Sequence, residues 1–208
     1  MTSTRKTFGS ALEPGASQGT GADAGGSAGA RTRDRGIASR GKLMNDHPCL
    51  HILCGKAGAG KSTLALSLAA AHNAILIAED IWLTRLYADR MKTFDDYRTY
   101  SQRARTVVGP LVIDLLRAGQ NVVMDYPANT KASRDWFRTL YQSAGAAHVL
   151  HYMDTPDPTC LKRIEKRNVE RPEGSYHLTR DDFAYVSSFF EAPHADEGFS
   201  VEIHVADG

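Results

Sequence analysis

From residue 49 onwards, short apolar runs alternate with longer stretches of mixed composition. The runs are rich in Val, Ile, Leu and Ala and are bounded by Gly, Pro or polar residues, which is typical of buried strands. This pattern predicts strands at residues 49–54, 74–78, 121–125, 148–153 and 201–205.

The stretches between the runs carry helical signals. Residues 63–71 are rich in Ala and Leu, which favour helices, and residues 93–118 place apolar side chains at helical spacing. Pro110 lies inside the second stretch and is expected to kink or end that helix. The predicted helices cover residues 63–71, 81–87, 93–118, 131–144, 159–168 and 180 to about 190.

Residues 1–44 show neither pattern. They hold 9 of the chain's 18 glycines and only six large apolar residues, so they cannot bury enough surface to offset the entropy lost on ordering. We predict a disordered Gly/Ala/Ser-rich tail at 1–44 and a single domain at 45–208. The tail is either a solvated leader or an extension ahead of a natural start at Met44, and its acidic residues and glycines fit an organellar transit peptide poorly.

The net charge of +1 is divided between a tail of +4 and a domain of −3. A basic tail can contact nucleic acid or an acidic surface, but the near-neutral domain gives no reason to expect non-specific nucleic-acid binding. No apolar stretch is long enough to span a bilayer. We therefore expect neither a nucleic-acid nor a membrane partner for the domain.

The cysteines and two of the histidines do not predict a metal site. Cys49, Cys54 and Cys160 lack metal-ligand spacing and are expected to be reduced packing residues of a cytoplasmic protein. His148 and His151 lie on opposite faces of a predicted strand, so they are not expected to chelate one metal together.

A phosphate-binding loop follows the first predicted strand. Its sequence fits the pattern G-x-x-x-x-G-K-[ST] and lies between a strand and a helix, as the motif requires. Lys61 is expected to reach the β- and γ-phosphates of ATP and Ser62 to ligate Mg²⁺, while the side chain of Lys56 is expected to point to solvent. The predicted nucleotide-binding residues are Gly55, Lys56, Ala57, Gly58, Ala59, Gly60, Lys61, Ser62 and Thr63.

Acidic residues follow the second and third predicted strands. In open α/β sheets, ligands bind beyond the carboxyl ends of the strands, so Glu79 and Asp80 are site candidates, although Asp80 could instead be the N-cap of the next helix. Asp125 ends the third strand in the manner of a Walker B carboxylate and is predicted to bind Mg²⁺ together with Ser62. Arg85 is expected either to face an anionic substrate or to pair with Asp89.

Arginines and aromatic residues leave two interpretations open. Arg163 and Arg167 are four residues apart and share a helix face; with Arg171 they form either a solvated face or a lid whose guanidinium groups hold phosphate. The aromatic side chains that precede the third strand form either helix packing or an acceptor pocket. They are Trp82, Tyr87, Tyr97 and Tyr100.

From about Leu50 to His204, the chain resembles bacterial AAA-type P-loop kinases of the zeta-toxin-like and chloramphenicol-phosphotransferase-like kind. The resemblance is carried by 55–62, the turn at Glu79-Asp80, the 122–125 segment and Arg163-x-x-x-Arg167. It implies an α/β, three-layer P-loop kinase fold, in which a five-stranded, mainly parallel sheet has helices on both faces. It also implies that Asp80 is the base for the acceptor hydroxyl and that the lid arginines hold the transferring phosphate.

We therefore expect an ATP- and Mg²⁺-dependent kinase that acts on the hydroxyl of a small molecule or nucleotide-sugar, with Lys61, Asp80, Arg163 and Arg167 as catalytic residues. The 126–129 segment matches no acceptor pocket of the family, so the acceptor stays open. Two other hypotheses are a nucleotide-dependent switch or NTPase without an acceptor, and a polynucleotide-end kinase assisted by the basic tail.

Overall fold

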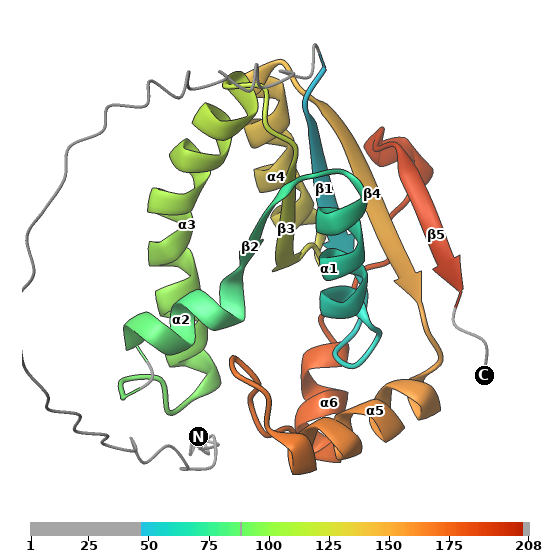
Figure 1. The fold of residues 1–208 in the computed structure, drawn as a ribbon. Helices are drawn as coiled ribbons and strands as arrows, with labels where there is room; N and C mark the ends of the chain where they lie inside the picture. Colours follow the sequence, from blue (N-terminus) through green and yellow to red (C-terminus); the bar gives the residue numbers. More distant parts are fainter. Residues whose placement is uncertain (1–46, 88, 206–208) are drawn as a thin grey trace, which may run out of the picture. The chain divides into compact units, whose positions relative to one another are not determined.

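The computed structural model describes residues 47–87 and 89–205. The predicted tail at 1–44 lies outside the described residues, and the domain is described here by itself. Five strands form one sheet in the order β2-β3-β1-β4-β5, and all four neighbouring pairs are parallel (Figure 1). The strands are β1 (Cys49–Cys54), β2 (Ile75–Ala78), β3 (Val122–Pro127), β4 (Ala147–Asp154) and β5 (Val201–Val205).

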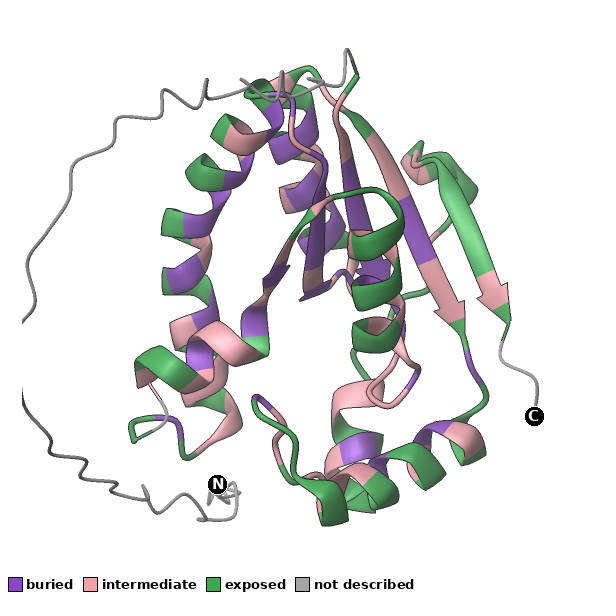
Figure 2. Ribbon diagram, in the orientation of Figure 1, coloured by how far each residue is buried: buried purple, intermediate pink, exposed green. Residues whose placement is uncertain are grey.

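Helices cover both faces of this sheet, which confirms the predicted fold class. On one face, α1 (Lys61–Ala71) packs Ala65 against Leu53 and Val123. On the other face, α3 (Phe94–Arg117) and α4 (Lys131–Ala144) enclose the main core, in which Leu50, Met124 and Phe137 are fully buried. The central strands are buried along most of their length, whereas β5 at the edge is mostly exposed (Figure 2).

Three further helices lie at the end of the sheet to which the strands point. They are α2 (Glu79–Tyr87), α5 (Asp157–Glu170) and α6 (Arg180–Ser187), and a 3-10 turn, η1 (Ala195–Glu197), precedes β5 (Figure 1). None of the helices in the described part of the chain is long and apolar enough to cross a membrane.

Several element boundaries differ from those predicted. Pro110 does not end α3, which runs through it to Arg117, because the packing of its buried face against α4 and the sheet outweighs the loss of one backbone hydrogen bond. The helix predicted at 81–87 begins at Glu79, and the third strand, predicted to end at residue 125, continues through Tyr126 and Pro127. The last helix ends at Ser187 rather than near Phe190.

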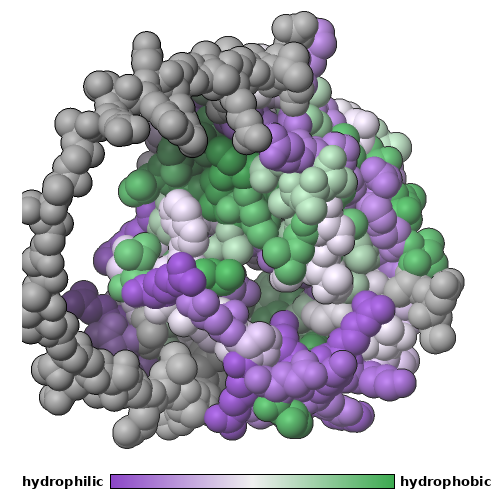
Figure 3. Space-filling model, viewed as in Figure 1, coloured by the Kyte–Doolittle hydropathy of each residue, from purple (hydrophilic) through white to green (hydrophobic). Residues whose placement is uncertain are grey.

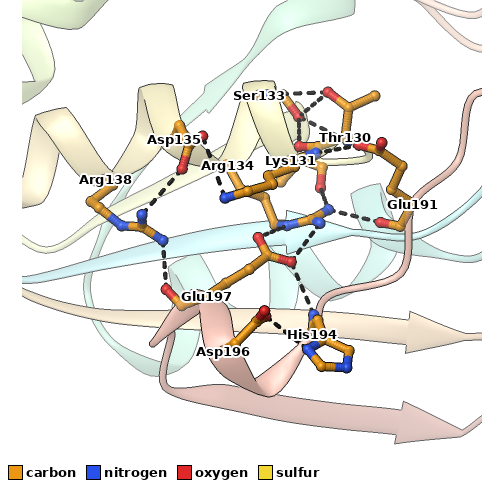
Figure 4. A network of polar contacts seen from close by, with 11 residues as sticks. Thr130, Lys131, Ser133, Arg134, Asp135, Arg138, Glu191, His194, Asp196 and Glu197 are labelled. Atoms are coloured by element: carbon orange, nitrogen blue, oxygen red, sulfur yellow. Dashed lines mark hydrogen bonds and ion pairs between the residues drawn. The ribbon is translucent and has the colours of Figure 1, made fainter.

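A buried ion pair fixes the segment that leads into β5. Nε and Nη2 of Arg134, in α4, each donate to a carboxylate oxygen of Glu197 at 2.7 Å, and both side chains are at most 4% exposed. Arg134 also donates to the carbonyl oxygens of Ala128 and Glu191 (Figure 4). Figure 4 further shows Arg138 donating to the backbone oxygen of Glu197. The end of β3, the start of α4 and the 191–197 segment are therefore held together by one charged network.

Candidate nucleotide and acceptor site

The phosphate-binding loop connects β1 to α1 at the middle of the sheet, where neighbouring connections run to opposite sides. This is the place where open α/β sheets bind ligands. Gly58 has φ of +77°, and a Cβ there would lie 2.5 Å from the carbonyl oxygen of Cys160 in α5. Only glycine allows this conformation and this close approach, so the loop geometry depends on its packing against α5.

Lys61, the first residue of α1, turns its side chain back into the loop. Its Nζ donates hydrogen bonds to the carbonyl oxygens of Gly55 (2.6 Å) and Lys56 (2.9 Å). Burial lowers the pKa of this ammonium group, and the carboxylates of Asp125 and Asp80 act in the opposite direction. The predicted lysine, metal ligand and base are thus brought close enough for their charges to interact.

Three side chains from outside the loop form hydrogen bonds with its backbone. Asn129, after β3, accepts a hydrogen bond from the Gly55 N–H at 2.9 Å. Thr155 and Arg163 both donate to the carbonyl oxygen of Ala59, at 3.1 and 3.0 Å. Arg163, which the sequence predicted as catalytic, therefore contacts the loop backbone directly.

The side chain of Lys56 follows a different direction from that of Lys61. It forms a 2.6 Å ion pair with Asp157 and lies over the ring of Phe190. Its place in the site is through its backbone oxygen, which accepts from Lys61. Ser62 and Thr63, which follow Lys61 in the first turn of α1, are exposed residues, so their hydroxyl groups are accessible to a ligand.

Asp125 lies where the pairing of β1 and β3 changes register. Ile52 pairs with Met124 and the next residue, Leu53, pairs with Pro127, so Asp125 and Tyr126 are extra residues on β3. Such irregularities re-aim side chains and occur next to functional sites. The half-exposed Asp125 carboxylate and the exposed Ser62 hydroxyl are both oxygen ligands, the type that Mg²⁺ prefers.

Glu79 and Asp80 occupy the first turn of α2, so Asp80 is not the N-cap of that helix, contrary to one of the two interpretations. Glu79 is 1% exposed and accepts hydrogen bonds from Tyr97 and Ser101. Asp80 is exposed, yet surrounding protein atoms, followed by Glu79 and Asp125, raise its pKa to about 7. Water that reaches this carboxylate screens part of the effect, which moderates the rise without changing its direction.

Polar groups that lack a hydrogen-bond partner lie near these carboxylates, and one of them, Arg105, forms an ion pair with Glu79 at 4.0 Å. Among the described residues, Nε of Arg105, Nε of Arg167 and the hydroxyl of Tyr126 are buried without a hydrogen-bond partner. Asp80 favours the charged form of Arg167, although burial lowers the pKa of that arginine overall. Buried polar groups without partners are uncommon, so their concentration here is consistent with a ligand-binding region.

The segment after α5 lies against α2. Arg85 donates two hydrogen bonds to Glu173, at 2.7 and 3.0 Å. Its acidic partner is therefore Glu173 and not Asp89, the partner considered from the sequence. A Cβ on Gly174 would lie 3.1 Å from the backbone nitrogen of Ile81, and Tyr176 packs against Tyr97. Hydrophilic side chains dominate the visible surface of α5 (Figure 3).

The aromatic residues near α2 serve packing. Tyr87 stacks on Tyr100 with ring centroids 4.4 Å apart, and both pack against the buried Leu83, while Trp82 packs against the main core. Arg171 is the C-cap residue after α5 and has an exposed side chain and φ of +47°. Arg105, Tyr126 and Asn129 are not among the predicted site residues, because each reaches the site through the register shift or through packing between elements distant in the chain.

The sequence model of the AAA domain family matches residues 50–193. A search of curated proteins finds no match. Among solved structures, a candidate kinase of Chloroflexus aurantiacus is 17% identical, with a TM-score of 0.61 over 76% of this chain and 85% of that one. The APS kinase of Mycobacterium tuberculosis, solved with AMPPNP and APS, is 21% identical, with a TM-score of 0.55 over 78% and 90%.

A third structure is that of Chaetomium thermophilum Kti12 in complex with ADP-AlF3, which is 17% identical, with a TM-score of 0.54 over 76% of this chain and 89% of that one. At these identities the likeness shows a shared fold. Because the family model covers more than half of the sequence, and because the sheet and helices agree with those of the solved kinases, the chain belongs to the AAA domain family and has the fold of P-loop kinases.

Proposed function

We propose that this protein is a kinase that transfers the γ-phosphoryl group of ATP to a hydroxyl of a small molecule or nucleotide-sugar. The observation that carries the proposal is the meeting of Lys61, Asp125, Asp80 and Arg167 at the carboxyl end of the sheet, beside a phosphate-binding loop. The fold shared with proteins solved with AMPPNP and ADP-AlF3 supports a nucleotide as the ligand.

Each residue has a distinct task in this proposal. Backbone N–H groups of the loop and the start of α1 hold the phosphates, and Lys61 exchanges its contacts with loop carbonyls for phosphate oxygens. Arg163 and Arg167 project from one face of α5 and add positive charge where negative charge spreads in the transition state. Asp80 orients the acceptor hydroxyl and takes its proton, and its raised pKa suits a base that works near neutral pH.

Ser62 and Asp125 would hold Mg²⁺, which when bound neutralises charge on the β- and γ-phosphates. Their oxygen donors and their exposure fit a hard cation that keeps several water ligands. The 172–176 segment, which contacts α2 through the hydrogen bonds of Arg85 to Glu173, would exclude water from the acceptor hydroxyl.

ADP release measured across a panel of hydroxyl-bearing metabolites tests the proposal. We expect one class of acceptor to stimulate ADP release well above the rate with water. The variant Lys61→Ala should lose this activity and bind a non-hydrolysable ATP analogue more weakly in calorimetric titration, because the mobile cation aimed at the phosphates is gone. Lys162→Ala is the matched control, since it removes an exposed lysine of α5 and should change neither property.

Two outcomes would contradict this proposal. Steady ATP hydrolysis that no acceptor stimulates would favour the nucleotide-dependent switch. Unchanged affinity and turnover in Lys61→Ala would overturn the nucleotide site itself.

A further inference from the structure

A second polar cluster lies on the α1 side of the sheet, across β1, β4 and β5. Nδ1 of His51 is 3.0 Å from Nε2 of His151, and Nδ1 of His151 is 3.1 Å from Nε2 of His204. Glu202 lies beside His151 and His204: one of its oxygens is 3.5 Å from Nδ1 of His151 and the other is 3.5 Å from Nε2 of His204. None of these four residues belongs to the proposed kinase site.

Strand geometry explains why these side chains converge. Glu202 and His204 are two residues apart on β5 and therefore point to the same face. His151 pairs with Glu202 across β4 and β5, which makes the two side chains direct neighbours. Along the sequence, the histidine nearest to His151 is His148, whose ring stacks on Tyr141 of α4. The cluster cannot be predicted from the sequence pattern because the pairing of β4 with β5 is a tertiary contact.

The spacing of His151, Glu202 and His204 matches that of ligands in a metal site. Ligand atoms bound about 2.0–2.2 Å from a tetrahedral metal lie about 3.3–3.6 Å from one another. The separations of 3.1 and 3.5 Å in the cluster are close to that range, and one ligand atom from each residue lies within 4.8 Å of the other two. Small side-chain rotations of Glu202, which is 59% exposed, would complete the arrangement.

The surroundings of His151 fit the role of a metal ligand. A ligating imidazole commonly donates its other N–H to a neighbouring acceptor, which fixes the ring, and Nδ1 of His51 is placed to accept from Nε2 of His151. His151 and His51 are 1% and 4% exposed, so the inner side of the cluster is shielded from solvent. With the Nε2 proton of His151 donated to His51, Nδ1 of His151 carries the lone pair, and the tautomer of His204 protonated on Nδ1 presents its Nε2 to the same metal.

We propose that His151, Glu202 and His204 form a binding site for a divalent transition metal of the Zn²⁺ class. Two imidazole nitrogens and one carboxylate suit Zn²⁺, Co²⁺ or Ni²⁺, whereas Mg²⁺ and Ca²⁺ prefer oxygen ligands alone. The metal fastens the exposed edge strand β5 to β4, and the half-exposed side of the cluster leaves room for water as a fourth ligand. This site is independent of the proposed kinase activity.

Calorimetric titration of the full chain with Zn²⁺, after removal of metals and without nucleotide, tests the site. We expect one Zn²⁺ per chain and a rise of several degrees in melting temperature, because a ligand that binds only the folded state stabilises it. Titration with Co²⁺ should give the intense visible absorption of a four-coordinate ion. Mg²⁺ should neither bind at this site nor displace Zn²⁺.

His204→Ala removes a partly exposed ligand and should lower the Zn²⁺ affinity at least tenfold and abolish the shift in melting temperature. Glu202→Gln keeps the shape of an exposed side chain and should also weaken binding. His194→Ala is the matched control, because His194 is an exposed histidine paired with Asp196 and should leave Zn²⁺ binding unchanged. Absence of Zn²⁺ binding to the unaltered chain, or equal affinity in His204→Ala, would overturn the proposal.

Discussion

Asp80 is exposed to solvent but carries a raised pKa, because protein atoms, Glu79 and Asp125 surround its carboxylate. The motif pattern alone could not separate a helix cap from a base. The structure removes the cap interpretation, since α2 already begins at Glu79. It also shows that Glu79 is turned inward, towards Tyr97 and Ser101, which is why the proposed function assigns the acceptor hydroxyl to the exposed Asp80.

Asp80→Asn should therefore separate nucleotide binding from chemistry. We expect turnover with an identified acceptor to fall by about 10² to 10⁴, the usual contribution of a general base. The ionised carboxylate is disfavoured in the folded chain, so the melting temperature should not fall, and the affinity for an ATP analogue should stay close to that of the unaltered protein. Asp89→Asn, in the exposed turn after α2, is the control and should turn over normally.

The pH dependence provides a separate check on Asp80. A base must be ionised, so kcat/KM of the unaltered protein should decrease as the pH falls through about 7. The residual activity of Asp80→Asn should lack this decrease. A turnover of Asp80→Asn within a few-fold of normal would show that the carboxylate only supports the start of α2.

The buried ion pair of Arg134 and Glu197 shows how elements far apart in the sequence become coupled. Hydrogen bonds from Arg134 are the largest cause of the low pKa of Glu197, about 2, and they outweigh the opposite effect of burial. A carboxyl group with a depressed pKa stabilises the fold fully above its unfolded pKa of about 4.3, and this contribution is lost as the pH falls from there towards 2.

Glu197→Gln should lower the free energy of unfolding by about 3 kcal/mol at neutral pH, because the buried Arg134 charge loses its partner. The difference from the unaltered protein should shrink as the pH falls from about 4 towards 2. Urea unfolding at several pH values measures both effects. Asp135→Asn, an exposed partner of Arg138, is the control, and a loss as small as that of the control would mean that the network does not fasten the 191–197 segment.

At the scale of the whole molecule, a chain that begins at Met44 tests the domain boundary. Residues 1–44 have too few large apolar side chains to contribute to a core. We expect such a chain to melt cooperatively within a few degrees of the full one, as measured by circular dichroism. A large loss of stability would place the start of the domain upstream of residue 45.

The sequence by itself determined the alternation of strands and helices, the phosphate-binding loop and the position of Asp125, since each depends on neighbours within a few residues. Tertiary structure alone decided which side chains meet. The register shift of β3 beside β1, the contact of Glu173 with Arg85 and the convergence of His151, Glu202 and His204 all join elements distant along the chain. Local periodicity reports the face on which a residue lies, but strand order and register decide what stands opposite.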